Sequence, residues 1–341
     1  MRLLIVKLSS IGDVVQALAV LEPLRPLCSH LGWVVEPPSL SLLEGHPLLE
    51  RVHLFPKERL RQGLSGANLL ATLRGLRAEL VRERYDTVLD LQGLFKSALV
   101  VRLSGARRRV GFAATRELSY LALTERVPPG RLERHAVLKY LDLARHLGGR
   151  VGRVSFPLAV RPEEAARVEA LAAGRKLVVV SPRTRWQSKE WPPARFAALV
   201  RLLSEEFAAT VALCGAQDER AELEAIRTRS GAGGVINLAG ELNLREFAHL
   251  CRRARLAVSC DSGPMHLAAA VGTPVVALFG PTAPWRTGPF GAIHRVVRKG
   301  LTCSPCFRKH CASRACLETI GEAEVLEVAR PLWEAGRAHP A

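Results

Sequence analysis

Short apolar runs alternate along the whole chain with longer stretches in which apolar residues recur at helical spacing. The first run, Leu3 to Leu8, leads into a glycine turn and then a helical pattern from Val14 to Leu27. Runs of this kind are typical of buried strands. They lie at 3–8, 33–35, 87–89, 110–112, 177–180, 210–213, 235–238, 256–259 and 274–279. The pattern predicts helices at 14–27, 67–84, 94–103, 135–147, 163–172, 192–206, 218–228, 244–253 and 322–335.

Strands that alternate with helices indicate parallel βαβ units with right-handed crossovers. The pattern weakens around Pro157 and Pro162 and then restarts. We therefore predict an α/β fold of two Rossmann-like domains, 1–160 and 170–320, whose parallel sheets face a central cleft. A final segment, 321–341, should be a helix that packs back on the first domain. Ligands of such sheets bind at the carboxyl ends of strands, and four candidate residues lie there: Asp13, Lys189, Gly215 and Asp261.

The stretch 258–291 carries the densest group of polar residues at such a strand end. The turn Cys260-Asp261-Ser262-Gly263 follows an apolar run, and Pro264 begins a helix that Gly272 ends. A helix N-terminus offers free N–H groups and the positive end of a dipole, which suits phosphate. Many strand-to-helix turns have this form and bind nothing. Asp261, Ser262, Gly263 and His266 nevertheless supply more polar groups than a simple turn needs.

Two further loops have candidate chemistry. The turn Ser9-Ser10-Ile11-Gly12-Asp13 has the strand, glycine and helix order of a phosphate loop but lacks the full G-x-G-x-x-G. Asp13 is either a helix cap or a general base. Lys189, in the polar loop 182–192, is either an inert surface lysine or a cation that neutralises a diphosphate. The chain has no D-x-D motif, so in a nucleotide-sugar transferase cations and N–H groups would replace a divalent metal.

Composition and charge narrow the class of protein. Apolar residues make up 48 %, which is typical of a globular chain. No apolar stretch reaches the roughly 18 residues that span a bilayer, and the first eight residues are too short for a signal peptide, so we expect a cytoplasmic protein. The net charge is +17, and residues 51–116 alone carry 14 bases and 5 acids. This excess suits an anionic membrane, a phosphorylated glycolipid or nucleic acid, unless it only solvates helix faces. With 5 % aromatic residues and no RNA-binding signature, no nucleic-acid partner is expected.

Eight cysteines are present, and four of them are spaced C-x2-C-x4-C-x4-C at 303, 306, 311 and 316, with His310 among them. Zinc, disulfides and free thiols are the alternatives. The spacing lacks the paired C-x2-C of a zinc ribbon, and we assign no metal.

Three segments resemble one known family. D-S-G-P-M-H-L-A-A-A-V-G-T-P-V-V-A-L-F-G-P-T, at 261–282, resembles the signature of glycosyltransferase family 9, the ADP-heptose lipopolysaccharide heptosyltransferases. V-K-L-S-S-I-G-D-V-V and D-L-Q-G-L-F-K-S are similar to the family's opening and its acceptor-side segment. The resemblance implies a GT-B fold and an inverting, metal-independent transfer of heptose. ADP-L-glycero-D-manno-heptose would be a substrate, not a cofactor, and the acceptor would be the Kdo/heptose inner core of lipopolysaccharide.

The acceptor would be Kdo-lipid A or heptosyl-Kdo-lipid A, with the first favoured, met at the inner face of the inner membrane. The resemblance makes Asp13 the general base. It assigns donor binding to Ser9, Ser10, Gly12, Thr184, Arg185, Lys189, Gly215, Glu219, Leu242, Asp261, Ser262, Gly263 and His266, and acceptor binding to Lys96, Arg116 and His135. Within the donor set, Glu219 would hold the ribose and Leu242 would lie by the adenine.

One departure concerns Arg185, because close relatives often have two adjacent hydroxyl residues where this chain has Thr184-Arg185. The alternatives are a related transferase with another nucleotide sugar or acceptor, and a non-catalytic α/β protein that binds a polyanion or nucleic acid. Both predict a cationic site, but only an enzyme would depend on Asp13 for turnover.

Overall fold

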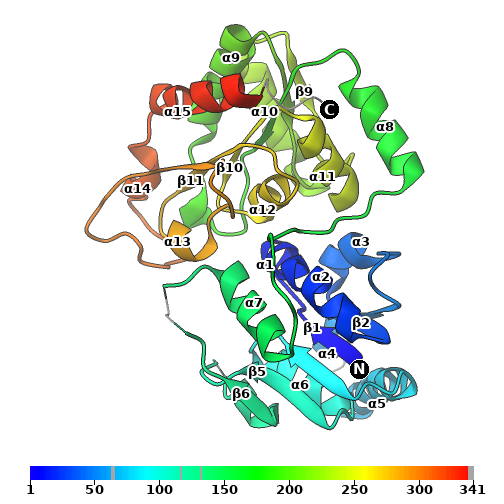
Figure 1. Ribbon diagram of the computed structural model, residues 1–341. Coiled ribbons are helices and arrows are strands. Elements are labelled where there is room, and N and C mark those ends of the chain that lie inside the picture. The colour runs from blue at the N-terminus through cyan, green and yellow to red at the C-terminus, as the bar shows by residue number, and fades with distance from the viewer. Residues whose placement is uncertain (63–65, 116, 131–132, 337–341) are drawn as a thin grey trace. The chain divides into compact units, whose positions relative to one another are not determined.

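The computed structural model describes residues 1–62, 66–115, 117–130 and 133–336, and the chain divides into two compact units, Met1–Ala159 and Val160–Ala341 (Figure 1). Each unit is built on a six-stranded sheet with every neighbouring pair of strands parallel. The predicted α/β class with parallel sheets is confirmed.

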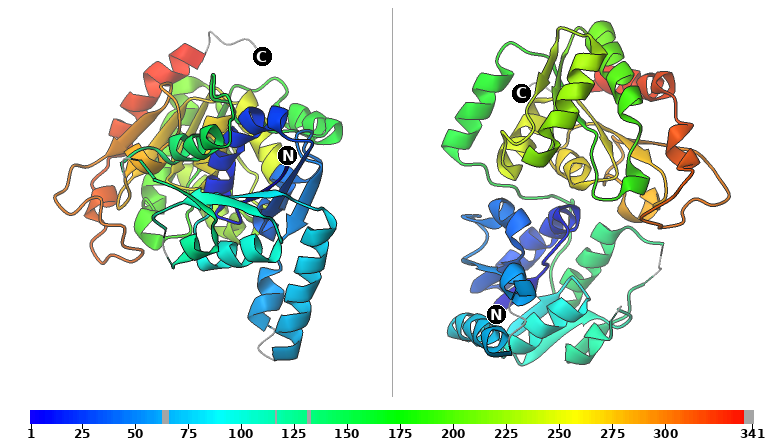
Figure 2. Two further views of the ribbon diagram at one scale, coloured as in Figure 1. Left: turned by 60° about the horizontal axis from the view of Figure 1, so that its bottom comes forward. Right: turned by 180° about the vertical axis from the view of Figure 1, so that it is seen from behind.

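In the first unit the strand order is β3-β2-β1-β4-β5-β6. The strands are β1 Arg2–Val6, β2 His30–Val35, β3 Arg51–Leu54, β4 Thr87–Asp90, β5 Arg108–Phe112 and β6 Glu125–Val127. Helices α1, α2, α3 and α7 form one layer, and α4, α5 and α6 form another (Figures 1 and 2). They are α1 Ile11–Ala17, α2 Leu21–Leu24, α3 Leu40–Leu43, α4 Lys57–Gln62, α5 Gly66–Arg82, α6 Phe95–Leu103 and α7 Ala136–His146, with 3₁₀ turns η1 Leu18–Val20, η2 Arg25–Leu27, η3 Pro37–Ser39 and η4 Ser119–Ala122.

In the second unit the order is β12-β11-β10-β7-β8-β9. The strands are β7 Leu177–Ser181, β8 Thr210–Leu213, β9 Val235–Asn237, β10 Leu256–Cys260, β11 Val275–Phe279 and β12 Arg295–Arg298. Helices α8, α11 and α12 pack together, as do α9, α10 and α15. The helical segments are α8 Pro162–Ala172, η5 Gln187–Lys189, α9 Pro193–Phe207, η6 Gln217–Glu219, α10 Arg220–Ser230, α11 Leu244–Arg253, α12 Gly263–Ala270, α13 Pro284–Thr287, α14 Ala315–Glu318 and α15 Glu322–Ala335.

Both sheets share one topology. Counted within its own unit, each runs 3-2-1-4-5-6, the doubly wound order in which the chain reverses direction between the first and fourth strands. The reversal lies between β1 and β4 in the first unit and between β7 and β10 in the second. Loops diverge from the carboxyl ends of these strand pairs and leave a crevice for ligands. The loops after β1, β4, β7 and β10 are therefore where each unit is built to bind something.

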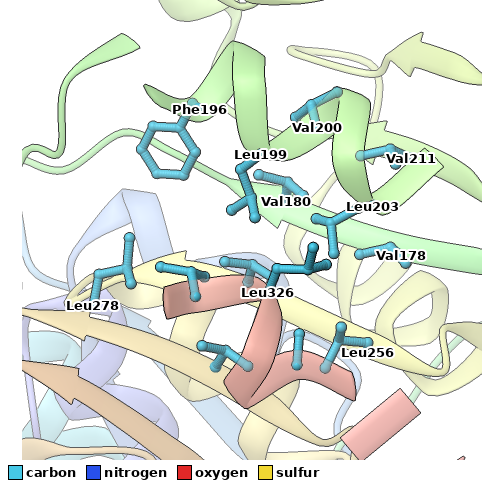
Figure 3. Packing of buried hydrophobic residues seen from close by; sticks show 14 of the residues in the cluster. Val178, Val180, Phe196, Leu199, Val200, Leu203, Val211, Leu256, Leu278 and Leu326 are labelled. Carbon is cyan, nitrogen blue, oxygen red and sulfur yellow. The ribbon is translucent and has the colours of Figure 1, made fainter. Parts of the chain in front are cut away.

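The core of the second unit lies between its sheet and the helices α9 and α15 (Figure 3). Phe196, Leu199 and Leu203 of α9 point onto β7, and Leu326 of α15 completes the layer. The last helix is predicted to pack on the first domain; in the structure α15 packs against α9 and the strands β10 to β12 of its own unit. The apolar side of α15 packs into this core. Near the end of the helix the Trp333 ring stacks on Phe207, with the ring centroids 4.8 Å apart.

The sequence pattern misses three strands, β3, β6 and β12. All three lie at an edge of their sheets, where one side has no neighbouring strand and most side chains are half-buried or exposed; only His53 of β3 and Val297 of β12 are buried. The expected continuous helix at 14–27 is instead a series of short α and 3₁₀ turns. Pro23 has no N–H for the α-helical ladder, and its ring crowds the carbonyl of Ala19. Among the described residues, no helix combines the length and apolar character needed to cross a bilayer.

Candidate functional site

The centre of the second unit's site is a buried ion pair at the reversal point of the sheet. Lys189, just after β7, places its Nζ 2.6 Å from Oδ2 of Asp261, which follows β10. The Thr282 hydroxyl donates to the same oxygen at 2.6 Å. Asp261 is only 6 % exposed and the Lys189 side chain 17 %. Sequence reasoning selects Lys189 and Asp261 separately. The structure joins them and adds Thr282, which ends the family-like motif 261–282.

Helix α12 begins directly beside this pair. Ser262 is its N-cap, but no side chain caps the helix, because the Ser262 hydroxyl lies 3.2 Å from that of Ser259. Pro264 occupies the first turn as predicted. The N–H groups of an uncapped first turn and the helix dipole favour an anion here. His266 is buried in the same helix, at 9 % exposure.

A third element of the site comes from the cysteine segment, residues 301–316. The carbonyls of Arg308 and Lys309 accept hydrogen bonds from the Ser188 hydroxyl at 2.6 Å and the Ser188 N–H at 3.3 Å. The Lys309 ammonium lies 5.7 Å from the centroid of the Trp186 ring, and Lys189 lies 4.6 Å from it. The loop that carries Lys189 is therefore anchored to the cysteine segment. Nothing in the sequence pattern indicates this contact.

The loop after β8 carries the predicted nucleotide residues Gly215 and Glu219. The Ala216 N–H donates to the Glu219 carboxylate at 2.7 Å. Burial raises the pKa of Glu219, although that hydrogen bond opposes the shift. A Cβ on Gly215 would lie 2.5 Å from Glu219 Oε2, the end of a flexible side chain, so a larger residue here would displace this carboxylate. Leu242 is half-buried in the loop before α11.

Thr184 and Arg185 lie in the same polar loop as Lys189. The Thr184 hydroxyl donates to the carbonyl of Trp186 at 2.8 Å, which closes a short turn. Arg185 is exposed. Its neighbour Arg183, which the sequence analysis does not select, forms ion pairs with Glu190 at 3.1 Å and Glu222 at 2.9 Å.

In the first unit the turn after β1 holds Asp13 by its own backbone and by a buried lysine. The Ser10 N–H and hydroxyl donate to Asp13 Oδ2 at 2.9 and 2.8 Å, so part of the predicted cap role is real. Lys7 Nζ lies 3.8 Å from the other oxygen, Oδ1. The Asp13 side chain remains 39 % exposed. The Ser10 and Lys7 contacts thus orient a carboxylate that stays partly exposed to solvent, and a general base needs such access to its substrate.

Lys7 is a functional candidate that the sequence analysis misses, although a lysine inside the apolar run 3–8 is the signal for it. Its side chain is 4 % exposed, and its ammonium lies 5.1 Å from the centroid of the Tyr140 ring. Burial acts to lower the pKa of Lys7, but nearby Asp13, Tyr140 and Asp90 outweigh it and the pKa is raised. Lys7 therefore keeps its positive charge beneath Asp13.

Lys96 connects the loops after β1, β2 and β4. Its ammonium donates to the Ser9 hydroxyl at 2.7 Å and also contacts Glu36, a carboxylate that sequence reasoning misses. Lys57 Nζ bonds the other Glu36 oxygen at 2.9 Å. Burial acts to raise the pKa of Glu36, but the two lysines outweigh it and lower the pKa. Gln92 Oε1 accepts from the N–H groups of Leu8 and Ser9, each at 3.1 Å, and fixes the turn.

Of the remaining acceptor candidates, His135 is the N-cap of α7 and accepts a hydrogen bond from the Val137 N–H at 3.2 Å. Gly12 is buried in α1. Arg116 lies outside the described residues. The structure therefore groups Ser9, Ser10, Gly12, Asp13 and Lys96 around the first reversal point.

The four clustered cysteines are unpaired thiols, and Cys303 and Cys311 are exposed. Backbone N–H groups of Arg314 and Ser313 lower the pKa of Cys311, whereas burial and the other three thiols raise the pKa of Cys316. Within the part of the chain that the structure describes, no three His, Cys, Asp or Glu side chains are placed to hold a metal ion.

This chain is similar to known proteins over most of its length. Residues 73–316 match glycosyltransferase family 9 (heptosyltransferase). Lipopolysaccharide heptosyltransferase 1 of Pseudomonas aeruginosa is 31% identical over 321 residues, which cover 91% of this chain and 87% of that protein. Lipopolysaccharide heptosyltransferase 2 of Escherichia coli is 31% identical over 246 residues, 68% of this chain and 70% of that protein. The structure of the E. coli heptosyltransferase WaaC with ADP-2-deoxy-2-fluoro heptose is 27% identical, with a TM-score of 0.78 over 97% of this chain and 99% of that one.

The solved heptosyltransferases share the two-sheet architecture over nearly their whole length, which confirms the GT-B fold expected from the sequence. The family match spans the loops after β4, β7, β8 and β10, and the relatives extend it to most of the chain. The chain therefore belongs to glycosyltransferase family 9, the heptosyltransferases, and is a glycosyltransferase.

Proposed function

We propose that the protein transfers heptose from ADP-L-glycero-D-manno-heptose to the Kdo/heptose inner core of lipopolysaccharide, with inversion at the anomeric carbon and without a divalent metal. The observation that carries the proposal is the Lys189–Asp261 pair beside the uncapped start of α12, at the reversal point of the second sheet. A relative of the same fold has been solved with an ADP-heptose analogue, which supports a nucleotide-heptose donor for this chain as well.

In this proposal the second unit binds the donor. The diphosphate lies against the N–H groups at the start of α12 and takes Lys189 as a counter-charge, with Thr184 and Arg185 on the same side. Glu219 receives the ribose hydroxyls and Leu242 contacts the adenine. The leaving group of the transfer is ADP, so negative charge develops where the cation and the helix dipole already lie.

Asp13 acts as the general base of the first unit. A single displacement with inversion needs one carboxylate to take the acceptor hydroxyl's proton as that oxygen attacks the anomeric carbon. The Ser10 contacts hold one Asp13 oxygen in place, and the Lys7 ammonium stabilises the charged form of the carboxylate before the proton arrives. Lys96, and His135 more peripherally, bind the anionic acceptor.

For the acceptor we favour Kdo-lipid A over heptosyl-Kdo-lipid A. The Pseudomonas aeruginosa type 1 relative and the Escherichia coli type 2 relative are equally identical, but the first matches over 91% of this chain and the second over 68%. A type 2 relative that covers 87% of this chain, from Haemophilus influenzae, is only 26% identical. Both acceptors are acylated glycolipids, so we also propose that the protein works at the anionic inner face of the membrane that holds them.

The test is a heptose-transfer assay with ADP-heptose in EDTA, offering Kdo-lipid A and heptosyl-Kdo-lipid A side by side. We expect product from Kdo-lipid A with an inverted anomeric configuration, read by NMR. Asp13→Asn should lower kcat by about 10²- to 10⁴-fold while calorimetry shows unchanged ADP affinity. The matched control, Glu58→Gln, changes an exposed carboxylate of the same unit and should behave as the unaltered protein.

Each outcome has a distinct meaning. Turnover that disappears in EDTA and returns with Mg²⁺ contradicts metal independence. Full activity in Asp13→Asn removes Asp13 as the base, and product only from heptosyl-Kdo-lipid A reverses the choice of acceptor.

A further inference from the structure

Three large apolar side chains are exposed together on the first unit. Phe95 is 68 % exposed, and Leu118 and Leu121 are each 61 % exposed, more than any other large hydrophobic residue that the structure describes. Single exposed apolar residues are common, but a group of them usually marks a surface that meets a partner.

The three residues form one ridge. The Phe95 N–H donates to the Glu117 carboxylate at 2.9 Å, which brings the start of α6 against the residue before Leu118. The Leu121 N–H donates to the Leu118 carbonyl at 3.0 Å, and Leu118 is the N-cap of the 3₁₀ turn η4. This hydrogen bond closes a tight turn and keeps Leu118 and Leu121 close together. We call Phe95, Leu118 and Leu121 the apolar ridge.

The backbone around the ridge is held in an uncommon conformation. Glu117 and Leu118 have φ values of 57° and 54°, the left-handed region that L residues with a side chain rarely adopt. Ser119, which is buried, anchors the turn through a 2.6 Å hydrogen bond from its hydroxyl to Thr115. The contacts around a turn of this kind must compensate for its strain, and the Ser119 hydrogen bond is one of them.

Cations border the ridge. The Arg126 guanidinium lies 5.1 Å from the centroid of the Tyr120 ring, between the two leucines in sequence, and Arg102 is exposed on α6. Lys96 follows Phe95 and turns toward Ser9. Glu117, the acid next to Leu118 in the chain, accepts a hydrogen bond from the Phe95 N–H. Apolar side chains rimmed by cations are the composition of surfaces that insert into the headgroup boundary of anionic bilayers.

We propose that the apolar ridge is the surface by which this protein docks on an anionic phospholipid bilayer. Phe95 and Lys96 are consecutive in the chain. Phe95 would enter the lipid, while Lys96 contacts Ser9 in the loop that carries Asp13. Docking there would hold the acceptor-binding loops at the depth of a glycolipid's sugar. The inference rests on the proposed lipid acceptor for its purpose, but the bilayer contact itself needs neither donor nor acceptor.

The experiment measures binding of the full chain to sucrose-loaded vesicles by co-sedimentation. Vesicles of phosphatidylethanolamine with phosphatidylglycerol are compared with phosphatidylcholine alone. The ridge variant is Phe95→Ser, Leu118→Asn and Leu121→Ser together, with asparagine chosen because it tolerates a left-handed backbone. We expect its partition coefficient on anionic vesicles to fall about tenfold or more, since each side chain loses a favourable transfer into lipid.

The control variant, Ile293→Ser with Val296→Ser, removes exposed apolar side chains of the second unit that are 46 % and 37 % exposed, and should bind vesicles normally. Circular dichroism and ADP titration check that both variants fold. Unchanged vesicle binding by the ridge variant overturns the proposal, and so does an equal loss in the control. The ridge variant could instead bind vesicles normally and show a higher KM for the acylated acceptor. That result would mean that the ridge contacts the acceptor's acyl chains, and it would overturn bilayer docking. Vesicle binding is read without turnover, so the absence of heptose transfer would refute the proposed function and leave this test intact.

Discussion

The buried pair of Lys189 and Asp261 allows structural and binding roles to be separated by a double-mutant cycle. The changes are Lys189→Met, Asp261→Asn and both together. Lys189→Met leaves Asp261 charged and 6 % exposed with only the Thr282 hydroxyl as partner. Asp261→Asn leaves a lysine whose 17 % exposed side chain can still reach water. The two single changes should therefore have unequal effects.

The magnitudes follow from the geometry. At 2.6 Å and an effective dielectric constant of 20, the Coulomb attraction is about 6 kcal/mol, and desolvation of the two charges offsets much of it. Removing one partner of a buried pair typically costs about 3–5 kcal/mol. With Thr282 still in place we expect about 3 kcal/mol for Lys189→Met and about 1 kcal/mol for Asp261→Asn. The double variant should lose only about 2 kcal/mol, a coupling of about 2 kcal/mol.

Urea unfolding followed by tryptophan fluorescence measures these free energies, because Trp186, Trp191, Trp285 and Trp333 all lie in the second unit. Calorimetry with ADP in EDTA measures binding. The unaltered protein and Asp261→Asn retain Lys189 for the diphosphate. Lys189→Met and the double variant lack it and should bind ADP about 30-fold more weakly, a loss of about 2 kcal/mol. Stability is partly rescued in the double variant and affinity is not.

The matched control is Lys299→Met, which breaks a surface pair with Glu324 whose side chains are 32% and 37% exposed. It should change the unfolding free energy by less than about 1 kcal/mol and leave ADP binding alone. Normal ADP affinity in Lys189→Met would refute the reasoning, since Lys189 would then be only the structural partner of Asp261. Additive stability effects would show that the 2.6 Å contact contributes nothing to folding.

Two further variants test single contacts. Gly215→Ala would place a Cβ 2.5 Å from Glu219 Oε2, so ADP affinity should fall about tenfold, or about 1.4 kcal/mol; Gly233→Ala, with no atom within 4 Å of the added Cβ, should leave it unchanged. The Arg245 guanidinium lowers the pKa of Glu164 from 4.5 to about 2, so this pair stabilises the fold fully above pH 4.5 and loses that contribution as pH falls toward 2. In Glu164→Gln the urea concentration at the unfolding midpoint should depend less on pH between 4.5 and 2 than in the unaltered protein. The same pH dependence in both proteins would contradict this coupling of protonation to stability.

The sequence predicts central elements better than edges. Strands such as 177–180 are fully buried and read as continuous apolar runs, whereas β3, β6 and β12 expose one edge and carry charged residues. The alternation of strands and helices therefore suffices for the fold class but not for the complete sheets. The packing partners of α15 cannot be read from the sequence for a related reason: an amphipathic stripe predicts that a helix packs on a sheet but does not identify which sheet.

The candidate site divides in the same way. Asp261 and Lys189 follow strands and lie in polar turns, so strand ends alone point to them. Glu36 and Thr282 take part through contacts that join distant segments, and such contacts have no local pattern. Lys7 is the exception, since a charged residue inside an apolar run is visible in the sequence and needs a partner when it is buried.

The two hydrogen bonds from Ser188 to the carbonyls of residues 308 and 309 attach the loop that carries Lys189 to the thiol-bearing segment. A chain in which residues 301–314 were exchanged for a tight turn would retain Asp261 but release Lys189 from its scaffold. If Lys189 binds the donor as proposed, a change in the length of that segment would alter donor affinity without replacing a donor-binding side chain. Alkylation of the exposed thiols in the segment would test the same effect.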